Sequence, residues 1–192
     1  MIRLFYGHTN TYFIDGLLVD TDLPGTMPAF RKALKQNGFS LGDIRFLLST
    51  HYHPDHMGLN GELQAAGVRL LVLDWQLPHL HFSDEIFARR EQISFTPLDE
   101  SALTVLTCAE SRAFLASIGI PGEILPTDSH SPDGIALLLD DGHAFVGDLE
   151  PRQFVGGYAD AADSPLCADW ERLLARSPRY LHFGHYNDQI LP

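Results

Sequence analysis

The stretch STHYHPDHMG, residues 49–58, places four metal-binding side chains within six positions: His51, His53, Asp55 and His56. Neutral imidazole and carboxylate are good ligands for zinc and related divalent metals. In an extended loop the two HxH histidines point the same way, whereas the last two side chains follow the bend imposed by Pro54. One loop can therefore serve two metals. Because four donors cannot complete two sites of roughly four ligands each, the stretch predicts more His and Asp ligands elsewhere.

The composition is that of a globular protein, and we expect a single domain over residues 1–192, of which 45% are apolar. A net charge of −12, with 13 scattered basic residues, disfavours nucleic acid as a partner. The N-terminus does not resemble a signal peptide, and no apolar run approaches the roughly 18 residues of a membrane span. We therefore expect a cytoplasmic protein with a small-molecule substrate and no membrane contact; its oligomeric state is open, a homodimer included. Cys108 and Cys167 are isolated and predict neither a disulfide nor a thiolate metal site.

Apolar runs and turn residues predict how the metal-binding stretch is positioned. Residues 2–6, 11–14 and 17–20 are expected to form strands, the last two joined by a hairpin at Asp15-Gly16. Apolar spacing near 3.6 predicts a helix over 27–38, and residues 44–50 then form a buried strand. The metal-binding stretch follows as a loop, because Pro54 argues against a strand there.

The remaining chain continues the alternation of helices and strands. Helices are expected over 57–66, 109–119 and 168–177, with a helix-compatible segment at 83–93. Strands are expected over 68–74, 123–127 and 180–183, and residues 135–148 form a hairpin around Asp141-Gly142. The segments 75–106 and 151–166 give no clear pattern as a whole. Three further polar residues follow apolar runs, where sites are commonly built: His130, Asp148 and His185.

These motifs, taken in order, resemble those of the metallo-β-lactamase-fold hydrolase superfamily. The matching segments are HYHPDH at 51–56, SHSPDG at His130, FVGDL at Asp148 and FGHYN at His185. The resemblance spans nearly the whole chain. It implies an α/β fold, the αβ/βα sandwich, in which two mixed β-sheets pack face to face with helices outside.

The resemblance also implies which residues bind two metals. One metal would be bound by His51, His53 and His130. The other would be bound by Asp55, His56 and His185, and Asp148 would bridge the two. Asp20, in LLVDTD, resembles an aspartate that supports these ligands from behind. Many members have Gly two residues later, where this chain has Asp22.

The chemistry implied is hydrolysis by a dinuclear metal centre. The cofactors expected are two divalent ions, zinc first, with manganese or iron as alternatives because such sites follow metal availability as well as affinity. A hydroxide shared by the metals would attack an ester, thioester or lactone bond of a small molecule. Asp55 is expected to be catalytic, steering this hydroxide or passing its proton to the leaving group.

Within the superfamily, the ligand pattern is similar to that of the glyoxalase II and lactonase-like branch. Lactonases commonly carry Tyr three residues after the bridging aspartate, where this chain has Pro151. Glyoxalase II enzymes carry basic residues and a helical C-terminal extension for glutathione, which the sequence after His185 does not match. We therefore predict the branch without naming the substrate.

Three alternative functions are also compatible with the sequence, and several other polar residues have an expected role. The alternatives are a phosphodiesterase or nuclease of the same fold, an iron-dependent redox enzyme, and a metal-stabilised binding protein without catalytic activity. The remaining histidines are expected to be structural or at the surface: His8, His79, His81, His143 and His182. His79 and His81, which form a second HxH pair, are also considered as pocket-lining. Three residues beside the motifs are candidates for lining the substrate pocket: Tyr52, Tyr186 and Asn187.

Overall fold

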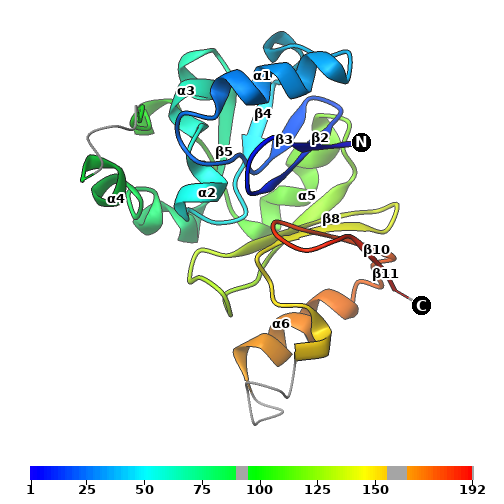
Figure 1. Cartoon of the computed structure of the whole chain (residues 1–192). Helices are drawn as coiled ribbons and strands as arrows, with labels where there is room; N and C mark the ends of the chain where they lie inside the picture. The colour runs from blue at the N-terminus through cyan, green and yellow to red at the C-terminus, as the bar shows by residue number, and fades with distance from the viewer. Residues whose placement is uncertain (90–94, 155–163, 192) are drawn as a thin grey trace. The chain divides into compact units, whose positions relative to one another are not determined.

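The computed structural model describes residues 1–89, 95–154 and 164–191. The chain forms two compact units, Met1–Thr107 and Cys108–Pro192, and each contains one mixed β-sheet with its own helices (Figure 1). We call them the first and the second unit. That the two units make a single domain stays a prediction.

The first unit contains a six-stranded sheet in the order β1-β2-β3-β4-β5-β6. Its strands are β1 (Ile2–Phe5), β2 (Asn10–Ile14), β3 (Leu17–Val19), β4 (Phe46–Leu48), β5 (Arg69–Leu73) and β6 (Thr104–Leu106). Strands β1 to β3 are antiparallel and β3 to β6 are parallel. The predicted hairpin between β2 and β3 is confirmed, since Asp15 and Gly16 have the positive φ angles, 45° and 94°, that a type I′ turn requires.

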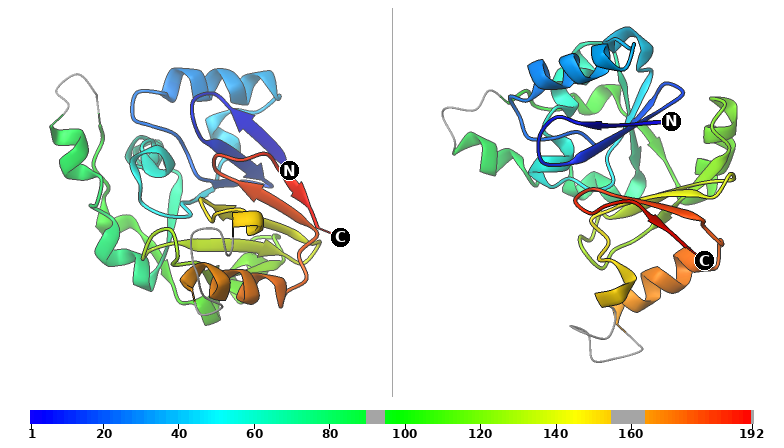
Figure 2. Two further views of the ribbon diagram at one scale, coloured as in Figure 1. Left: turned by 60° about the horizontal axis from the view of Figure 1, so that its bottom comes forward. Right: turned by 45° about the vertical axis from the view of Figure 1, so that its right-hand side comes forward.

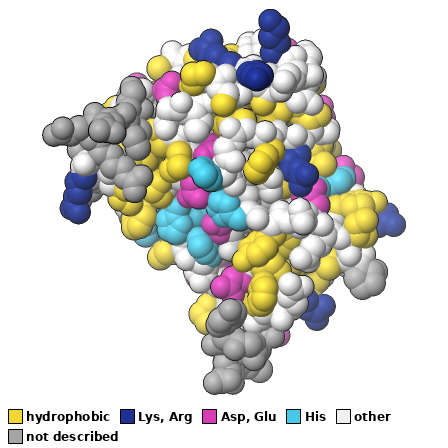
Figure 3. Space-filling model, in the orientation of Figure 1, with side chains coloured by type: hydrophobic (Ala, Val, Ile, Leu, Met, Phe, Trp, Pro, Cys, Tyr) yellow, Lys and Arg dark blue, Asp and Glu magenta, His cyan; other side chains and the backbone are white. Residues whose placement is uncertain are grey.

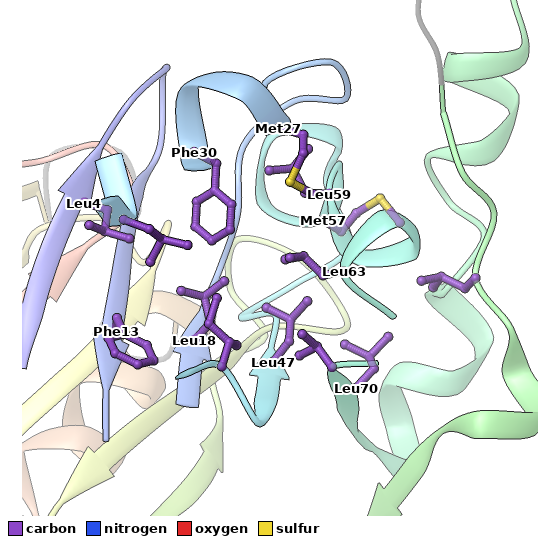
Figure 4. Close-up of a cluster of buried hydrophobic side chains, with 14 of the residues drawn as sticks. Leu4, Phe13, Leu18, Met27, Phe30, Leu47, Met57, Leu59, Leu63 and Leu70 are labelled. Atoms are coloured by element: carbon purple, nitrogen blue, oxygen red, sulfur yellow. The ribbon is translucent and has the colours of Figure 1, made fainter. Parts of the chain in front are cut away.

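Helices cover one face of this sheet and bury its apolar side chains. The helices are α1 (Met27–Gln36), α2 (Pro54–Met57), α3 (Asn60–Ala65) and α4 (Asp84–Ala88), with 3-10 turns η1 (Leu41–Asp43), η2 (Asp74–His79) and η3 (Glu100–Ala102). Figure 4 shows Phe30 of α1 directed toward Leu18 of β3, in one cluster with Leu47 and Leu63. Burial of these side chains is the main term that holds α1 and α3 against the sheet.

The second unit contains a five-stranded sheet in the order β11-β10-β9-β8-β7. Its elements are α5 (Cys108–Ser117), β7 (Gly122–Pro126), β8 (Ile135–Leu139), β9 (His143–Gly147), η4 (Arg152–Phe154), α6 (Pro165–Leu174), β10 (Tyr180–Phe183) and β11 (Gln189–Ile190). Strands β9 and β10 are parallel and the other neighbours are antiparallel. Helix α6 lies along one face of this sheet (Figure 2), where Trp170 and Leu173 pack against Val146 and Leu181.

The predicted helix over 57–66 is wrong in its start and its continuity. The chain forms α2 and α3 instead, and α2 begins at Pro54, so Asp55 and His56 lie on a helical turn rather than in a loop. The ring of Pro54 fixes φ at a helical value, which suits the first position of a helix. Strands β6 and β11 had no sequence signal, and the part of the predicted helix 83–93 after Arg89 lies outside the described residues.

None of the helices in the described part of the chain has the length and apolar character needed to cross a bilayer.

Candidate metal centre

The four predicted ligands of the first unit follow strand β4, next to Asp20 at the end of β3. The two strands are parallel neighbours with Val19 opposite Leu48, so their carboxyl ends meet at one edge of the sheet. The Asp20 N–H donates a hydrogen bond to Leu48 O at 2.9 Å. Asp20 has a left-handed backbone, with φ of 59°, a conformation that non-glycine residues adopt only where surrounding contacts hold them.

Those contacts are hydrogen bonds that the Asp20 carboxylate accepts from the metal loop, residues 49–58. Asp20 Oδ1 accepts the Thr50 N–H at 2.6 Å, and Oδ2 accepts both the Thr50 hydroxyl at 2.8 Å and His56 Nδ1 at 3.0 Å. Because the Thr50 hydroxyl donates to Asp20, its oxygen is left to accept from His51 Nδ1, 3.2 Å away. The Nδ1 atoms of His51 and His56 therefore carry the protons.

This network fits a metal site, because it leaves the Nε2 atoms of His51 and His56 as the metal-binding nitrogens. A carboxylate or hydroxyl behind the other ring nitrogen fixes the tautomer and orientation of metal-binding histidines in general. The ring of His51 lies 4.4 Å from that of His53 and 4.2 Å from that of His56, centroid to centroid. Ligand atoms of His51 and His53, and likewise of Asp55 and His56, lie within 4.8 Å of each other.

Two buried side chains hold the metal loop in place and were not singled out from the sequence. The Gln76 side-chain amide donates to Ser49 O at 3.2 Å, and the Ser83 hydroxyl donates to Tyr52 O at 2.7 Å. Both Gln76 and Ser83 are completely buried. A polar residue in a segment without clear periodicity gives no signal of such a role.

Asp22, two residues after Asp20, is also fully buried. Its carboxylate accepts the backbone N–H groups of His8, Thr9 and Leu23. A side chain at Gly7 would overlap this carboxylate, so Gly7 makes room for Asp22. Asp22 therefore holds the loop between β1 and β2 through hydrogen bonds to its backbone.

The three predicted ligands of the second unit gather around Asp148. Phe183 of β10 lies opposite Gly147 of β9, so Asp148 and His185 emerge from the same edge of the sheet. Asp148 Oδ2 lies 3.4 Å from His185 Nε2 and 3.6 Å from His130 Nε2. One carboxylate oxygen therefore stands between two imidazoles, as expected of a ligand that the two metals would share.

Helix α6 positions the loop that carries His130. The buried Asp169 carboxylate accepts the Ser129 N–H at 2.8 Å and pairs with Arg172 at 2.7 Å. Arg172 also donates to Pro126 O at 2.6 Å. Asp169 was not singled out from the sequence, although it falls on the apolar face of α6 together with Leu166, Trp170 and Leu173. A carboxylate in that spacing was the available signal.

The other histidines take part in separate contacts. The His81 ring lies 2.7 Å from Asp84 and 2.9 Å from Glu100, and these hydrogen bonds, Glu100 first, raise its pKa. His143 Nδ1 and His182 Nε2 are 2.7 Å apart, and His182 Nδ1 is 3.2 Å from Asp188. In the part of the chain that the structure describes, none of these histidines joins a group of metal-ligand side chains.

Each unit therefore brings its own share of the predicted ligands together. The first unit gathers the four residues of the metal loop and the second gathers the three that follow β7, β9 and β10. That both sets bind the same pair of metals stays a prediction.

Comparison with known proteins gives one family and several similar structures. A structure of a metallo-beta-lactamase family protein from Thermus thermophilus, TTHA1429, has a TM-score of 0.70 and 22% identity over 95% of this chain and 70% of that one. The structure of TTHA1623 in a di-iron-bound form has a TM-score of 0.67 and 27% identity over 98% and 93% of the two chains. The BLEG-1 B3 metallo-beta-lactamase has a TM-score of 0.67 and 20% identity over 98% of this chain and 93% of that one. No curated protein matches the chain.

The predicted α/β class, with two mixed sheets and helices, is confirmed by these findings, whereas the glyoxalase II and lactonase-like branch stays a prediction. Members of the superfamily in question are mostly metal-dependent hydrolases. Its family model matches residues 5–185, and the chain accordingly belongs to the metallo-beta-lactamase superfamily.

Proposed function

We propose that the chain is a dinuclear metal-dependent hydrolase that cleaves an ester, thioester or lactone bond of a small molecule. The observation that carries this proposal is the Asp20 network, which prepares His51 and His56 to bind metal through Nε2. The two metals are assigned to the ligand sets expected from the sequence, with Asp148 shared between them. The Asp148 carboxylate between His130 and His185 supports that assignment.

The metals, when bound, would supply a hydroxide nucleophile at neutral pH and polarise the scissile carbonyl. The chain's own residues orient the reaction. Thr50 and Asp20 hold two imidazoles in place, and Asp55 lies half-buried in the first turn of α2. We assign to the Asp55 carboxylate the task of holding a proton and passing it to the leaving group, the general acid–base role.

Zinc is the first choice of metal, with iron and manganese as the alternatives. Imidazole and carboxylate ligands suit all three, so the donor set does not separate them. The di-iron-bound form of TTHA1623, which is 27% identical to this chain, makes iron a specific alternative to test.

A carbonyl substrate is favoured over a phosphodiester by the charge of the chain. The net charge is −12, and the basic side chains on the face drawn in Figure 3 occur singly or in small groups rather than as one continuous surface. A nucleic-acid partner depends on many phosphate contacts, which such a surface does not favour. We therefore propose a small-molecule substrate, no nucleic-acid or membrane partner, and a cytoplasmic location.

The test is hydrolysis by metal-loaded protein of a thioester, a lactone and a phosphodiester, with Asp55→Ala and Asp43→Ala as matched aspartate variants of the first unit. We expect turnover of a carbonyl substrate that falls by at least about a hundredfold in Asp55→Ala, in line with the loss of a general acid–base group. Asp43→Ala, which alters an exposed carboxylate in η1, should keep its activity. Turnover of the phosphodiester alone, or full activity in Asp55→Ala, would overturn the proposal.

A further inference from the structure

We propose that Leu77, Phe82 and Ile86 form an apolar wall beside the metal loop, and that this wall binds the acyl group of the substrate. The preferred substrates would then be esters or thioesters with an apolar acyl chain, rather than with a small polar acid. This inference rests on the proposed function and names its substrate class. We call these three side chains the acyl wall.

The segment 77–86 exposes several large apolar side chains to solvent. Of eight large apolar side chains exposed in the described part of the chain, three lie within residues 77–86: Leu77 at 38%, Phe82 at 55% and Ile86 at 36%. Leaving such side chains in water forgoes the favourable free energy that burial of each one would provide. A concentration of them in one short segment is typical of a surface that contacts a ligand or partner.

Phe82 lies beside one of the predicted metal ligands. The Phe82 ring lies 5.3 Å from the ring of His53, centroid to centroid, with the planes tilted by 38°. His53 is a ligand of the first metal in the proposed site. The exposed Phe82 ring therefore lies beside a side chain that would hold the metal, so an acyl chain in contact with Phe82 would place its carbonyl group close to that metal.

The segment that carries Leu77 and Phe82 is fixed to the metal loop by hydrogen bonds on both sides of these two residues. Gln76 is bonded to Ser49 O before them, and Ser83 is bonded to Tyr52 O after them. Phe87, next to Ile86, is buried in the core of the first unit. A wall held in this way loses little conformational entropy when a ligand binds to it.

The charged side chains near Phe82 also affect which acyl group can bind. The ionisable groups next to Phe82 are engaged with each other, since His81 bonds both Asp84 and Glu100. Because one imidazole faces two carboxylates, the group has a net negative charge, which disfavours an acidic acyl group. What remains for recognition is apolar contact area, which favours an aliphatic or aromatic acyl chain.

The experiment compares acetyl and octanoyl thioesters of N-acetylcysteamine, whose leaving group is uncharged. We expect the wild type to have the larger kcat/KM for the octanoyl thioester. Phe82→Ala should lower the ratio of octanoyl to acetyl kcat/KM about tenfold, chiefly through KM, because a hydrophobic contact changes specificity by about 10- to 200-fold. Leu77→Ser provides a second variant with the same expected direction.

Phe5→Ala is the matched control, since Phe5 is an exposed phenylalanine of the same unit, on β1. It should leave the ratio unchanged. A second readout is calorimetric binding of octanoate to the metal-loaded protein, which should weaken in Phe82→Ala while the metal content stays equal. Equal kcat/KM for the two thioesters in the wild type, or an unchanged ratio in both wall variants, would overturn the inference.

Failure of the inference is distinguishable from failure of the proposed function. If no carbonyl substrate is hydrolysed, the proposed function is wrong. Octanoate binding alone then decides whether the acyl wall binds an acyl chain. Octanoate binding that depends on Phe82 would support the wall without the hydrolase, and binding that ignores Phe82 would overturn both. Hydrolysis without chain-length preference would overturn the wall and leave the hydrolase standing.

Discussion

A single carboxylate, that of Asp20, sets the tautomers of two histidines in the first unit. It accepts from His56 directly and from His51 through the Thr50 hydroxyl. All four side chains are buried, so water does not compete for these hydrogen bonds. The metal-binding nitrogens are thereby oriented before any metal arrives.

Asp20→Ala is expected to weaken zinc binding roughly 10- to 100-fold, the usual cost of removing the group behind a metal-binding histidine. Competition with a chromophoric chelator measures this affinity. Asp43→Asn, which alters an exposed carboxylate in η1, serves as the control and should bind zinc like the wild type. Equal affinities of Asp20→Ala and the wild type would contradict the role given to Asp20.

Gly58 ends the metal loop at a position where a side chain has no room. A Cβ there would lie 2.4 Å from Asp22 O and from the Pro24 ring. Gly58→Ala should therefore lower the free energy of unfolding by about 1–3 kcal/mol, as overpacking does. Urea unfolding provides the measurement, with Gly42→Ala as the control because its nearest atom, Ser40 Oγ, is 3.7 Å away. Similar midpoints for the two variants would refute this packing argument.

At the scale of elements, His81 ties α4 to η3 through Asp84 and Glu100. These two partners raise the pKa of His81 above its ordinary value of 6.5. The contribution of this contact to stability is therefore fully present below pH 6.5 and is lost as the pH rises through the higher folded-state pKa. Because the His81 side chain is 48% exposed, solvent screening keeps the effect small.

The expected result is a difference in Tm between the wild type and His81→Gln that is largest at acidic pH and shrinks as the pH rises above 6.5. Thermal unfolding at a series of pH values measures it, with His79→Gln as the reference for a neighbouring histidine. A difference that grows with pH would show that His81 is not bound as a cation.

Elements with strong local signals could be predicted from the sequence, and elements held by tertiary contacts could not. The Asp15-Gly16 hairpin and the glycine stop after α1 depend on positive φ angles that local residues decide. Strand β6 is only three residues long and exists because it pairs with β5. Helix α2 has no apolar periodicity, so only Pro54 could have marked its start.

At the scale of the whole molecule, the predicted ligands come from segments far apart in the sequence. The metal loop could be recognised by itself because its donors are adjacent, whereas His130, Asp148 and His185 gained meaning only through their order along the chain. Gln76 and Ser83 could not be assigned, because their roles are hydrogen bonds to backbone groups brought close by folding. Asp169 is marked only by its place on the apolar face of α6, which does not reveal its bond to the Ser129 backbone. The sequence therefore points to candidate metal-binding side chains more readily than to the residues that hold them in place.

We propose that the chain binds two metals through the ligand sets expected from the sequence. Elemental analysis of metal per chain, after purification without added metal and again after reloading, tests it most directly. We predict about two equivalents in the wild type and about one in His185→Ala, which lacks a ligand of the second metal. One equivalent or none in the reloaded wild type, with metal content unchanged in His185→Ala, would contradict the dinuclear account.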